Sequence, residues 1–122
     1  MSIQVINIKQ KLNLIHEHWS PHIAGELNGQ HVKLAKLKGA FVMHNHQDED
    51  ELFLVIYGEL KIELETEILT VQPGEFVIIP KGVNHKPICE HEVGILLFEP
   101  ASTLNTGNQQ VEGLTKTQLN TI

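Results

Sequence analysis

Two histidines separated by a single residue, His44 and His46, have the types and spacing that metal chemistry requires. In a β-strand, residues i and i+2 point to the same face and lie about 7 Å apart along the chain, so both imidazoles can reach one metal ion. Glu51 follows five residues after His46, and a turn between them can bring its carboxylate back beside the pair. His85 follows the turn Pro80-Lys81-Gly82, which allows a neighbouring strand to supply a fourth ligand. The spacing therefore predicts a site of three imidazoles and one carboxylate.

This set of donors suits a divalent transition metal, which is the cofactor we expect: Fe, Mn, Ni, Cu or Zn. The identity of the metal stays open, because divalent affinities follow the metal series more than the ligand types. Four protein ligands leave coordination positions open on a six-coordinate ion, where a substrate oxygen can bind.

The elements that must position these side chains are short β-strands separated by Gly and Pro. Asn28-Gly29 predicts a tight hairpin between His22–Leu27 and Gln30–Lys38, because both central residues need a positive φ. Seven further strands are expected from composition and alternation: Phe41–Asn45, Leu52–Tyr57, Glu59–Glu65, Glu67–Val71, Phe76–Pro80, Lys86–Cys89 and Gly94–Phe98. Many short strands at this spacing indicate a sandwich or a barrel.

The two ends of the chain differ from this pattern. Ile8–His18 has a loose helical period that Trp19-Ser20-Pro21 ends. From Ala101 the chain turns polar, and Leu114–Leu119 predicts either a short helix or an irregular tail. We expect one domain over residues 1–122, with a barrel core at about 22–100 and a tail at 101–122.

The spacing of the candidate ligands resembles the two motifs of the cupin superfamily, G-x5-H-x-H-x(3 or 4)-E-x6-G and G-x5-P-x-G-x2-H-x3-N. The sequence contains Gly39-x4-His44-x-His46-x4-Glu51-x6-Gly58 and then Gly74-x5-Pro80-x-Gly82-x2-His85. Two positions depart from the motifs. The first spacing is one residue short, which leaves the equivalence of Gly39 open, and Cys89 replaces the final Asn.

By this resemblance the chain is identified as a small single-domain cupin, similar to the phosphomannose-isomerase-type small cupins. The resemblance implies an all-β fold, an antiparallel jelly-roll β-barrel with a short N-terminal helix and a partly irregular C-terminal tail. It implies that the metal ligands are His44, His46, Glu51 and His85. It also implies a homodimer with the extra N-terminal strands packed across the interface, and a structural loop from Glu99 onward at one end of the barrel.

Strand alternation predicts which side chains shape a pocket beside the metal. Glu51, Phe53, Val55 and Tyr57 share a face, and so do His44, Val42 and Ala40, whereas Phe41 and Met43 face the other way. The candidate substrate-lining residues are Phe53, Val55 and Cys89, with plain core roles as the alternative. For Cys89 the alternative is a buried structural thiol.

The other histidines are interpreted as surface residues or as adventitious metal binders. His16 and His18 lie in the expected helix, where residues i and i+2 point in different directions. His22 and His31 are nearby, and His91 lies between two glutamates in an expected solvated turn.

Composition limits the partners. The net charge is −6, and all nine basic residues are Lys, so the chain has no basic stripe and no Arg for bidentate contacts with nucleic acid. No apolar run approaches the roughly 20 residues that span a bilayer. A lone Cys and the absence of a secretory pattern at the N-terminus favour the cytoplasm.

Two classes of function follow. The first is a metal-dependent enzyme that acts on a small molecule, with dioxygenase-like chemistry preferred over a Lewis-acid isomerase. This preference arises because an isomerase needs a base, and Glu51, the one carboxylate placed near the metal, is occupied as a ligand. The second is a non-catalytic module that binds a small molecule or sugar. The catalytic residues and the substrate are not specified by the sequence.

Overall fold

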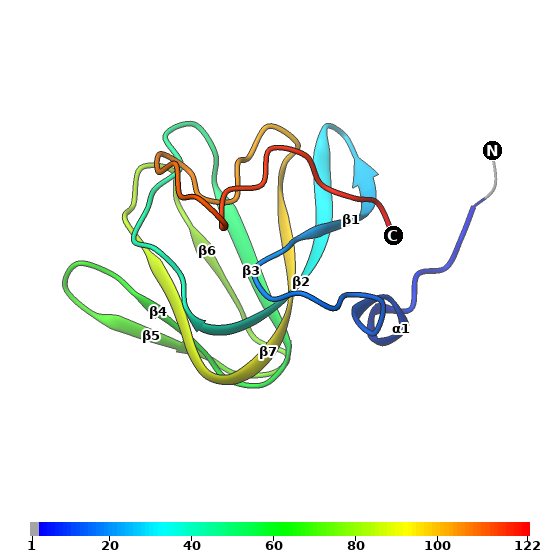
Figure 1. Ribbon diagram of the computed structural model, residues 1–122, viewed down its shortest axis with the longest axis horizontal. Coiled ribbons are helices and arrows are strands. Elements are labelled where there is room, and N and C mark those ends of the chain that lie inside the picture. The colour runs from blue at the N-terminus through cyan, green and yellow to red at the C-terminus, as the bar shows by residue number, and fades with distance from the viewer. Residues whose placement is uncertain (1–2) are drawn as a thin grey trace.

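The structure is a computed structural model that describes residues 3–122, so Met1 and Ser2 of the expected domain lie outside the described residues. One helix precedes seven strands: α1 (Ile8–Leu12), β1 (His22–Leu27), β2 (Gln30–Ala40), β3 (Glu51–Tyr57), β4 (Leu60–Glu63), β5 (Ile68–Val71), β6 (Phe76–Ile79) and β7 (Lys86–Pro100). All strand pairs are antiparallel, and the sheet order is β1-β2-β7-β3-β6, with the β4–β5 hairpin on the first part of β7 (Figure 1). This is the predicted all-β jelly-roll fold.

The long strand β7 joins the two halves of the fold. Its later residues pair with β3, from Phe98 opposite Leu52 to Gly94 opposite Tyr57, and its first residues pair with β4. The sequence predicted two strands here, Lys86–Cys89 and Gly94–Phe98, but the chain stays extended between them. His91 therefore lies within a strand and not in a turn, although its side chain is exposed as expected.

Strand alternation places one face of β3 in the core. Glu51, Phe53 and Val55 are buried, whereas Leu52 and Leu54 are half-exposed on the other face. The buried face packs against apolar side chains of the other strands, namely Ala35, Leu37, Leu60, Ile62, Val71, Ile79, Cys89, Val93, Ile95 and Leu97. Burying each large apolar side chain contributes roughly 1.5–3 kcal/mol. The interior is thus apolar except at the end where Glu51 begins β3.

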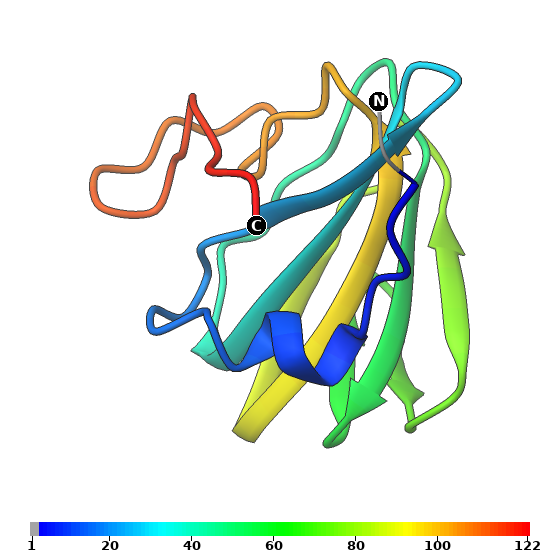
Figure 2. The same ribbon diagram turned by 90° about the vertical axis from the view of Figure 1, so that its right-hand side faces the viewer.

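The helix is shorter than the predicted Ile8–His18. Asn7 caps α1 by accepting a hydrogen bond from the Gln10 backbone, 3.0 Å, and the helix ends at Leu12. Leu12 and Ile15 then pack on Leu34 of β2, so that the N-terminal segment lies against the outer face of the sheet (Figure 2). Packing against the sheet, and not helical periodicity, decides the path of residues 13–19.

Two further segments differ from the sequence-based expectations. Phe41–Asn45 is not a strand; its strand-like contact is a bridge between His44 and His85. Leu114–Leu119 forms turns and bends, the irregular alternative. Among residues 3–122, no helix has both the length and the apolarity needed to cross a membrane.

Candidate metal centre and its cavity

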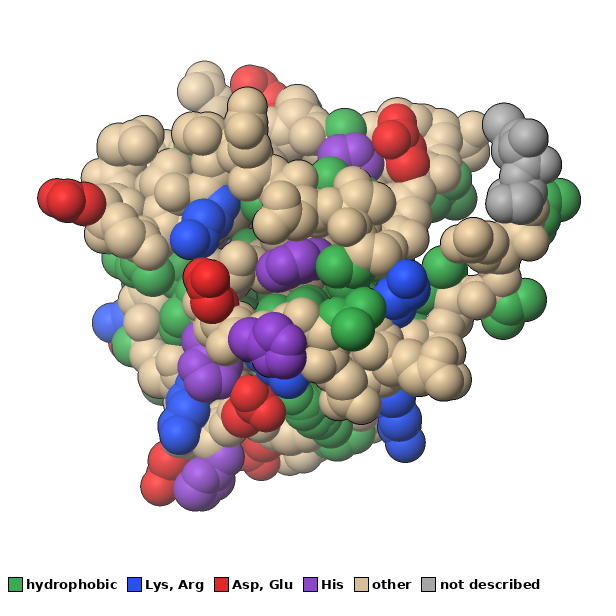
Figure 3. Space-filling model, turned by 45° about the vertical axis from the view of Figure 1, so that its right-hand side comes forward, with side chains coloured by type: hydrophobic (Ala, Val, Ile, Leu, Met, Phe, Trp, Pro, Cys, Tyr) green, Lys and Arg blue, Asp and Glu red, His purple; other side chains and the backbone are tan. Residues whose placement is uncertain are grey.

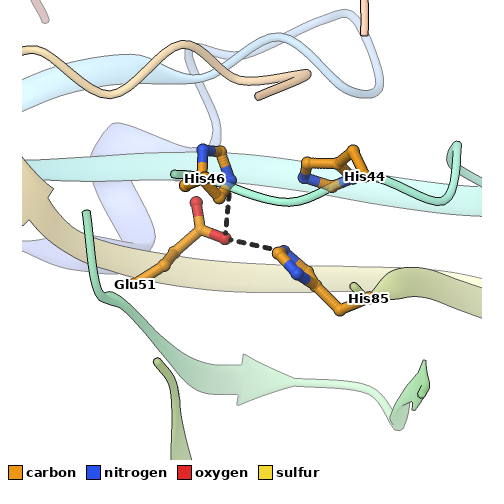
Figure 4. Close-up of side chains that lie close together, drawn as sticks. All are labelled: His44, His46, Glu51 and His85. Carbon is orange, nitrogen blue, oxygen red and sulfur yellow. Dashed lines mark hydrogen bonds and ion pairs between the residues drawn. The ribbon is translucent and has the colours of Figure 1, made fainter. Parts of the chain in front are cut away.

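Four buried side chains from three parts of the chain converge at one end of the sheet. His44, His46, Glu51 and His85 each offer a ligand atom, and these atoms all lie within 4.8 Å of one another. Glu51 Oε1 is 3.1 Å from His85 Nε2 and 3.4 Å from His46 Nε2 (Figure 4). The structure thus brings together all four residues that the spacing singled out.

Backbone hydrogen bonds hold the histidine segments side by side. The His44 N–H donates to the His85 carbonyl at 3.0 Å, and the His85 N–H donates to the His44 carbonyl at 2.8 Å. The Gly82 N–H donates to the His46 carbonyl at 2.8 Å, so the Pro-x-Gly turn is fastened directly to the second histidine. Two short extended segments thereby act as one support for three imidazoles.

Two of the imidazoles have a defined orientation and tautomer. Nδ1 of His44 lies 2.8 Å from the Val42 carbonyl, and Nδ1 of His85 lies 2.9 Å from the Val83 carbonyl. A carbonyl oxygen only accepts, so both Nδ1 atoms carry the hydrogen when the rings are neutral. Each Nε2 then presents a lone pair for a ligand, as in metal sites where a backbone carbonyl orients the histidine.

His46 is buried with neither ring nitrogen in a hydrogen bond, since its 3.4 Å approach to Glu51 has poor hydrogen-bond geometry. An unpaired polar atom in a protein interior is costly. A cation between the four side chains would accept the His46 lone pair and be neutralised in part by Glu51. Three imidazoles and a carboxylate match a divalent transition metal, so these residues fit such an ion.

A second carboxyl group, which the sequence did not place at the site, lies beside Glu51. Glu99 and Lys33 are each only 2% exposed, and Lys33 Nζ donates to Glu99 Oε1 at 2.9 Å and to the Thr103 carbonyl at 3.4 Å. By strand alternation, the side chain of Lys33 in β2 and that of Glu99 in β7 both point toward the interior. Two oppositely charged residues at inward positions of paired strands could have indicated this pair from the sequence. The signal was missed because the predicted strand Gly94–Phe98 ended one residue before Glu99.

The two carboxyl groups titrate in opposite directions. Burial raises the pKa of Glu99 well above its usual range, and the charge of Glu51 raises it further, against the opposing effect of the Lys33 ammonium. Burial opposes ionisation of Glu51 as well, but its interactions with Glu99, His46 and His85 hold its pKa well below the usual range. Of the two carboxyl groups, Glu99 therefore binds a proton more readily than Glu51.

The site lies at the wall of a cavity with an open volume of about 40 Å³. Nine of its lining residues are apolar: Trp19, Pro21, Ala35, Leu37, Phe41, Phe53, Pro87, Ile95 and Leu97. The other four are His44, Glu51, Glu99 and Asn105. Among the candidate substrate-lining residues, Phe53 lines the cavity, whereas Val55 and Cys89 pack in the core away from it. The cavity is thus a largely apolar space with its polar groups at the metal site.

Phe41 was expected to point away from the ligands, and this prediction is wrong. Its side chain is only 7% exposed, lines the cavity and meets the His44 ring edge-on, with ring centroids 5.4 Å apart. The alternation rule fails because the segment is not paired as a regular strand. For the same reason Val42 is half-exposed. Ala40, the last residue of β2, is exposed as well, so neither side chain points inward as expected.

Comparison with known proteins decides the family. The family model described as "Cupin domain" matches residues 30–98, more than half of the chain. The chain belongs to the cupin family.

Three relatives illustrate the similarity. A crystal structure of a cupin-2 domain containing protein from Shewanella frigidimarina has 45% identity and a TM-score of 0.78, over 79% of this chain and 94% of that one. Protein NMB1881 from Neisseria meningitidis has 30% identity and a TM-score of 0.74, over 80% and 100%. The uncharacterized protein YdbB of Bacillus subtilis is 33% identical over 66% of this chain and 72% of its own length. None of these descriptions names a substrate.

In this cupin the C-terminal segment packs over the metal end of the fold. The Asn108 N–H donates to the Asn45 carbonyl at 3.0 Å, and Asn108 Oδ1 accepts from the Asn45 N–H at 3.0 Å. Gly107 has a φ of 57°, and a Cβ there would collide with the Asn45 carbonyl and crowd the His44 ring. Only glycine allows the tail to approach the ligand segment so closely.

The remaining histidines lie outside the site. His16, His18 and His91 are exposed, and His18 Nε2 is 2.9 Å from a Glu92 carboxylate. Several histidine side chains also reach the surface on the face seen in Figure 3, among apolar, acidic and basic side chains. His22 and His31 are half-buried, so the expectation of surface positions holds only in part for them.

Cys89, the residue that departs from the second motif, is buried in β7. Burial raises the pKa of its thiol, against a hydrogen bond with the Gly39 backbone. A thiol with a raised pKa is a poor nucleophile. Its surroundings favour the structural role.

Acid is expected to destabilise the metal-free protein through His44. Burial and the nearby charge of His85 lower the pKa of His44 from 6.5 to about 4. The unfolded chain therefore binds a proton at this position before the folded protein does, and folding free energy is lost as the pH falls from about 6.5 to about 4. The full effect of this one group is roughly 3 kcal/mol.

Urea unfolding of metal-free protein tests this between pH 7 and pH 4. His44→Asn should lose less unfolding free energy over this range than the parent, with His16→Asn as the exposed control. Equal pH dependence in the parent and His44→Asn would contradict this assignment.

The buried Lys33–Glu99 pair should show strong energetic coupling. Glu99→Leu leaves the Lys33 ammonium buried without its carboxyl partner, which should cost about 3–5 kcal/mol of unfolding free energy. Lys33→Met together with Glu99→Leu removes both polar groups and should cost clearly less than Glu99→Leu alone. Denaturant unfolding of the variants measures this. A double variant at least as unstable as Glu99→Leu would show that the pair is not coupled as described.

Proposed function

We propose that this cupin binds one divalent transition metal, Fe, Mn, Ni, Cu or Zn, through His44, His46, Glu51 and His85, and catalyses a reaction of a small molecule in the adjoining cavity. The observation that carries this proposal is the convergence of four buried donor atoms, two of them on preoriented imidazoles and one on a ring without any hydrogen bond. When bound, the ion supplies a Lewis-acid centre with open positions for oxygen ligands.

Oxygen chemistry on a small molecule, a dioxygenase-like oxidoreductase activity, is the first candidate. The cavity walls are mainly apolar, and Phe41 and Phe53 exclude water from the donor atoms on two sides. A dry, apolar space protects reactive species from side reactions with water. Few groups in it could bind the several hydroxyls of a sugar.

Proton transfer in a Lewis-acid isomerase is the second candidate, and Glu99 is the observation that favours it. The sequence argument against an isomerase assumed that Glu51 was the one carboxylate near the metal. Glu99 lines the same cavity, is not among the four clustered donors and has a raised pKa, which suits an acid–base group. Glu51 is therefore not the one carboxyl group beside the cluster, and the lack of a base no longer counts against an isomerase. Non-catalytic binding remains the alternative to both reactions.

Metal content and turnover, measured on the same preparations, test the proposal. Untagged protein should contain about one divalent metal per chain by elemental analysis, and His44→Ala and Glu51→Gln should lose most of it, whereas His91→Ala should retain it. Fe(II)- or Mn(II)-loaded protein should then consume O₂ with one of a panel of small enediols, catechols and thiols.

The outcomes separate the candidates. Deuterium incorporation from solvent without O₂ uptake would indicate the isomerase, and Glu99→Gln should then abolish it without removing the metal. Saturable binding with neither reaction would indicate a binding module. Unchanged metal content in His44→Ala and Glu51→Gln would refute the metal site itself.

We also infer that the protein is a homodimer in the cytoplasm. The resemblance implies an interface through the N-terminal strands, whereas the exposed apolar side chains favour the face of β6 and β3. The outer face of the sheet carries Phe76, 62% exposed, and Ile78, 52% exposed, on the edge strand β6, next to Leu52 and Leu54 of β3. The extended segment before α1 projects away from the sheet, with Ile3 98% exposed (Figure 1). Exposed apolar surfaces of this kind mark protein interfaces. The free, buried Cys89 thiol agrees with a reducing compartment.

Light scattering tests the dimer. The protein should have twice the mass of the chain, and Phe76→Glu combined with Ile78→Lys should produce monomers, because charges in an apolar interface lose their hydration. Ile68→Lys, an equally exposed position on β5, is the matched control and should remain dimeric. A monomeric parent protein, or a dimeric Phe76→Glu/Ile78→Lys variant, would contradict this interface.

A further inference from the structure

Trp19 has an unusual backbone conformation at the cavity. The sequence predicted for it only a role in ending the helix. The φ of Trp19 is 60°, in the left-handed region that bulky side chains rarely adopt. Two hydrogen bonds hold it there: its N–H donates to the Lys36 carbonyl at 2.9 Å, and its indole Nε1–H donates to the Lys38 carbonyl at 2.9 Å. A strained residue that is fastened in this way often has a functional role.

The Trp19 ring continues an aromatic wall that reaches the metal site. It stacks on Phe41 with ring centroids 4.8 Å apart and an angle of 20° between the planes. Phe41 in turn meets the His44 ring at 5.4 Å and 82°. Both aromatic side chains line the cavity, so a molecule that reaches the metal ligands passes along these rings.

Much of the remaining cavity lining is apolar as well. Ala35, Leu37, Ile95 and Leu97 line the cavity and have no hydrogen-bonding group in their side chains, which leaves Glu99 and Asn105 as the polar lining residues outside the clustered donors. No lysine lines the cavity, because the Lys33 ammonium is engaged by Glu99 and the Thr103 carbonyl. A phosphate or a sugar acid would find no free cation, and a sugar would find few partners for its hydroxyls.

The size of the cavity also limits its occupant. Its open volume is about 40 Å³, whereas a buried apolar cavity that holds one benzene ring has about 150 Å³. A ring therefore enters only in part, and the rest of the molecule lies at the open side of the cavity.

We propose that the cavity selects a planar, largely apolar molecule, one edge of which enters with its oxygen donors at the His44 end, and that Trp19 and Phe41 form the wall that determines this specificity. This inference rests on the proposed metal-dependent function and names its substrate class. Stacking on the two rings orients the planar molecule, and the apolar walls discriminate against polyols and phosphates, whose polar groups would be buried without partners.

Fluorescence provides a direct test, since Trp19 is the one tryptophan of the sequence. Catechol, titrated into zinc-loaded protein that cannot turn it over by redox chemistry, should change the Trp19 fluorescence in a saturable manner. Mannose and inorganic phosphate at the same concentrations should leave it unchanged. Tighter binding of mannose or phosphate than of catechol would overturn the inference.

Variants locate the binding, measured by calorimetry with catechol. Trp19→Phe keeps a stacking ring and should bind within about threefold of the parent, whereas Trp19→Ala should lose about tenfold. Ala35→Leu places a larger side chain in the cavity and should also weaken binding at least tenfold. This variant keeps the test valid if Trp19→Ala fails to fold. Ile68→Ala, on the exposed face of β5, is the control and should bind normally. Unchanged affinity in both Trp19→Ala and Ala35→Leu would refute the assignment.

The test also separates this inference from the metal site. Protein that retains zinc but shows no fluorescence response to catechol would refute the inference and leave the metal proposal intact. Protein that takes up no zinc would refute the metal proposal. In that case phenol, which needs no metal, tests whether the aromatic wall binds a planar molecule. Saturable quenching of Trp19 fluorescence would support this role of the wall, and no response would overturn it.

Discussion

Two hydrogen bonds between the backbones of His44 and His85 join segments that are far apart in the chain, and the geometry of the site depends on them. They place two imidazoles in contact, with ring centroids 4.3 Å apart. The Nδ1 bonds to Val42 and Val83 then determine which nitrogen of each ring is free. Because both restraints come from the backbone, the lone pairs are oriented before any ligand arrives, which lowers the entropic cost of binding one.

Burial of ionisable groups is the cost of building such a site inside an apolar sheet. Glu51 can remain ionised there because interactions with its neighbours outweigh the loss of hydration. Glu99 lines the cavity beside Glu51, and Lys33, its ion-pair partner among the described residues, extends this polar cluster into β2. A buried pair of this kind contributes little net stability. The position of this pair beside Glu51 therefore explains its presence better than a stabilising role in the fold does.

The sequence predicted the features that follow from local rules. The hairpin at Asn28-Gly29 is present, with φ values of 51° and 78°. The alternation of β3, which buries Glu51 and Phe53 on one face, was predicted as well. Motif spacing identified the four clustered side chains because turn geometry and strand period restrict where they can point.

The failures arose where long-range contacts override local pattern. Phe41 was assigned to the wrong side because its segment was treated as a paired strand. Its backbone meets the segment around His85 and Pro87 only at Phe41, which donates to the Pro87 carbonyl, and at the His44 bridge. Glu99 and Lys33 were missed because a charge at an inward position is recognisable only when both strands and their register are known. Nothing in the local sequence around Trp19 specifies a positive φ, which two carbonyls of β2 impose.

The features that the fold itself does not require gather at one end of the molecule. Trp19, with its strained backbone, and the buried Glu99 line the cavity. His46, with its unpaired nitrogens, lies beside Glu51, and Gly107 lies close to His44, two residues that also line it. Each of them costs folding free energy, and the apolar core between the strands must offset that cost. The β4–β5 hairpin, which pairs with the first residues of β7, has no comparable feature among the described residues; its strands pair regularly and bury Leu60 and Ile62. A division of this kind is expected when one end of a rigid sheet is a scaffold and the other has been shaped by a ligand. The polar cluster and the aromatic wall are therefore parts of one functional unit, with the cluster of His44, His46, Glu51 and His85 as its centre.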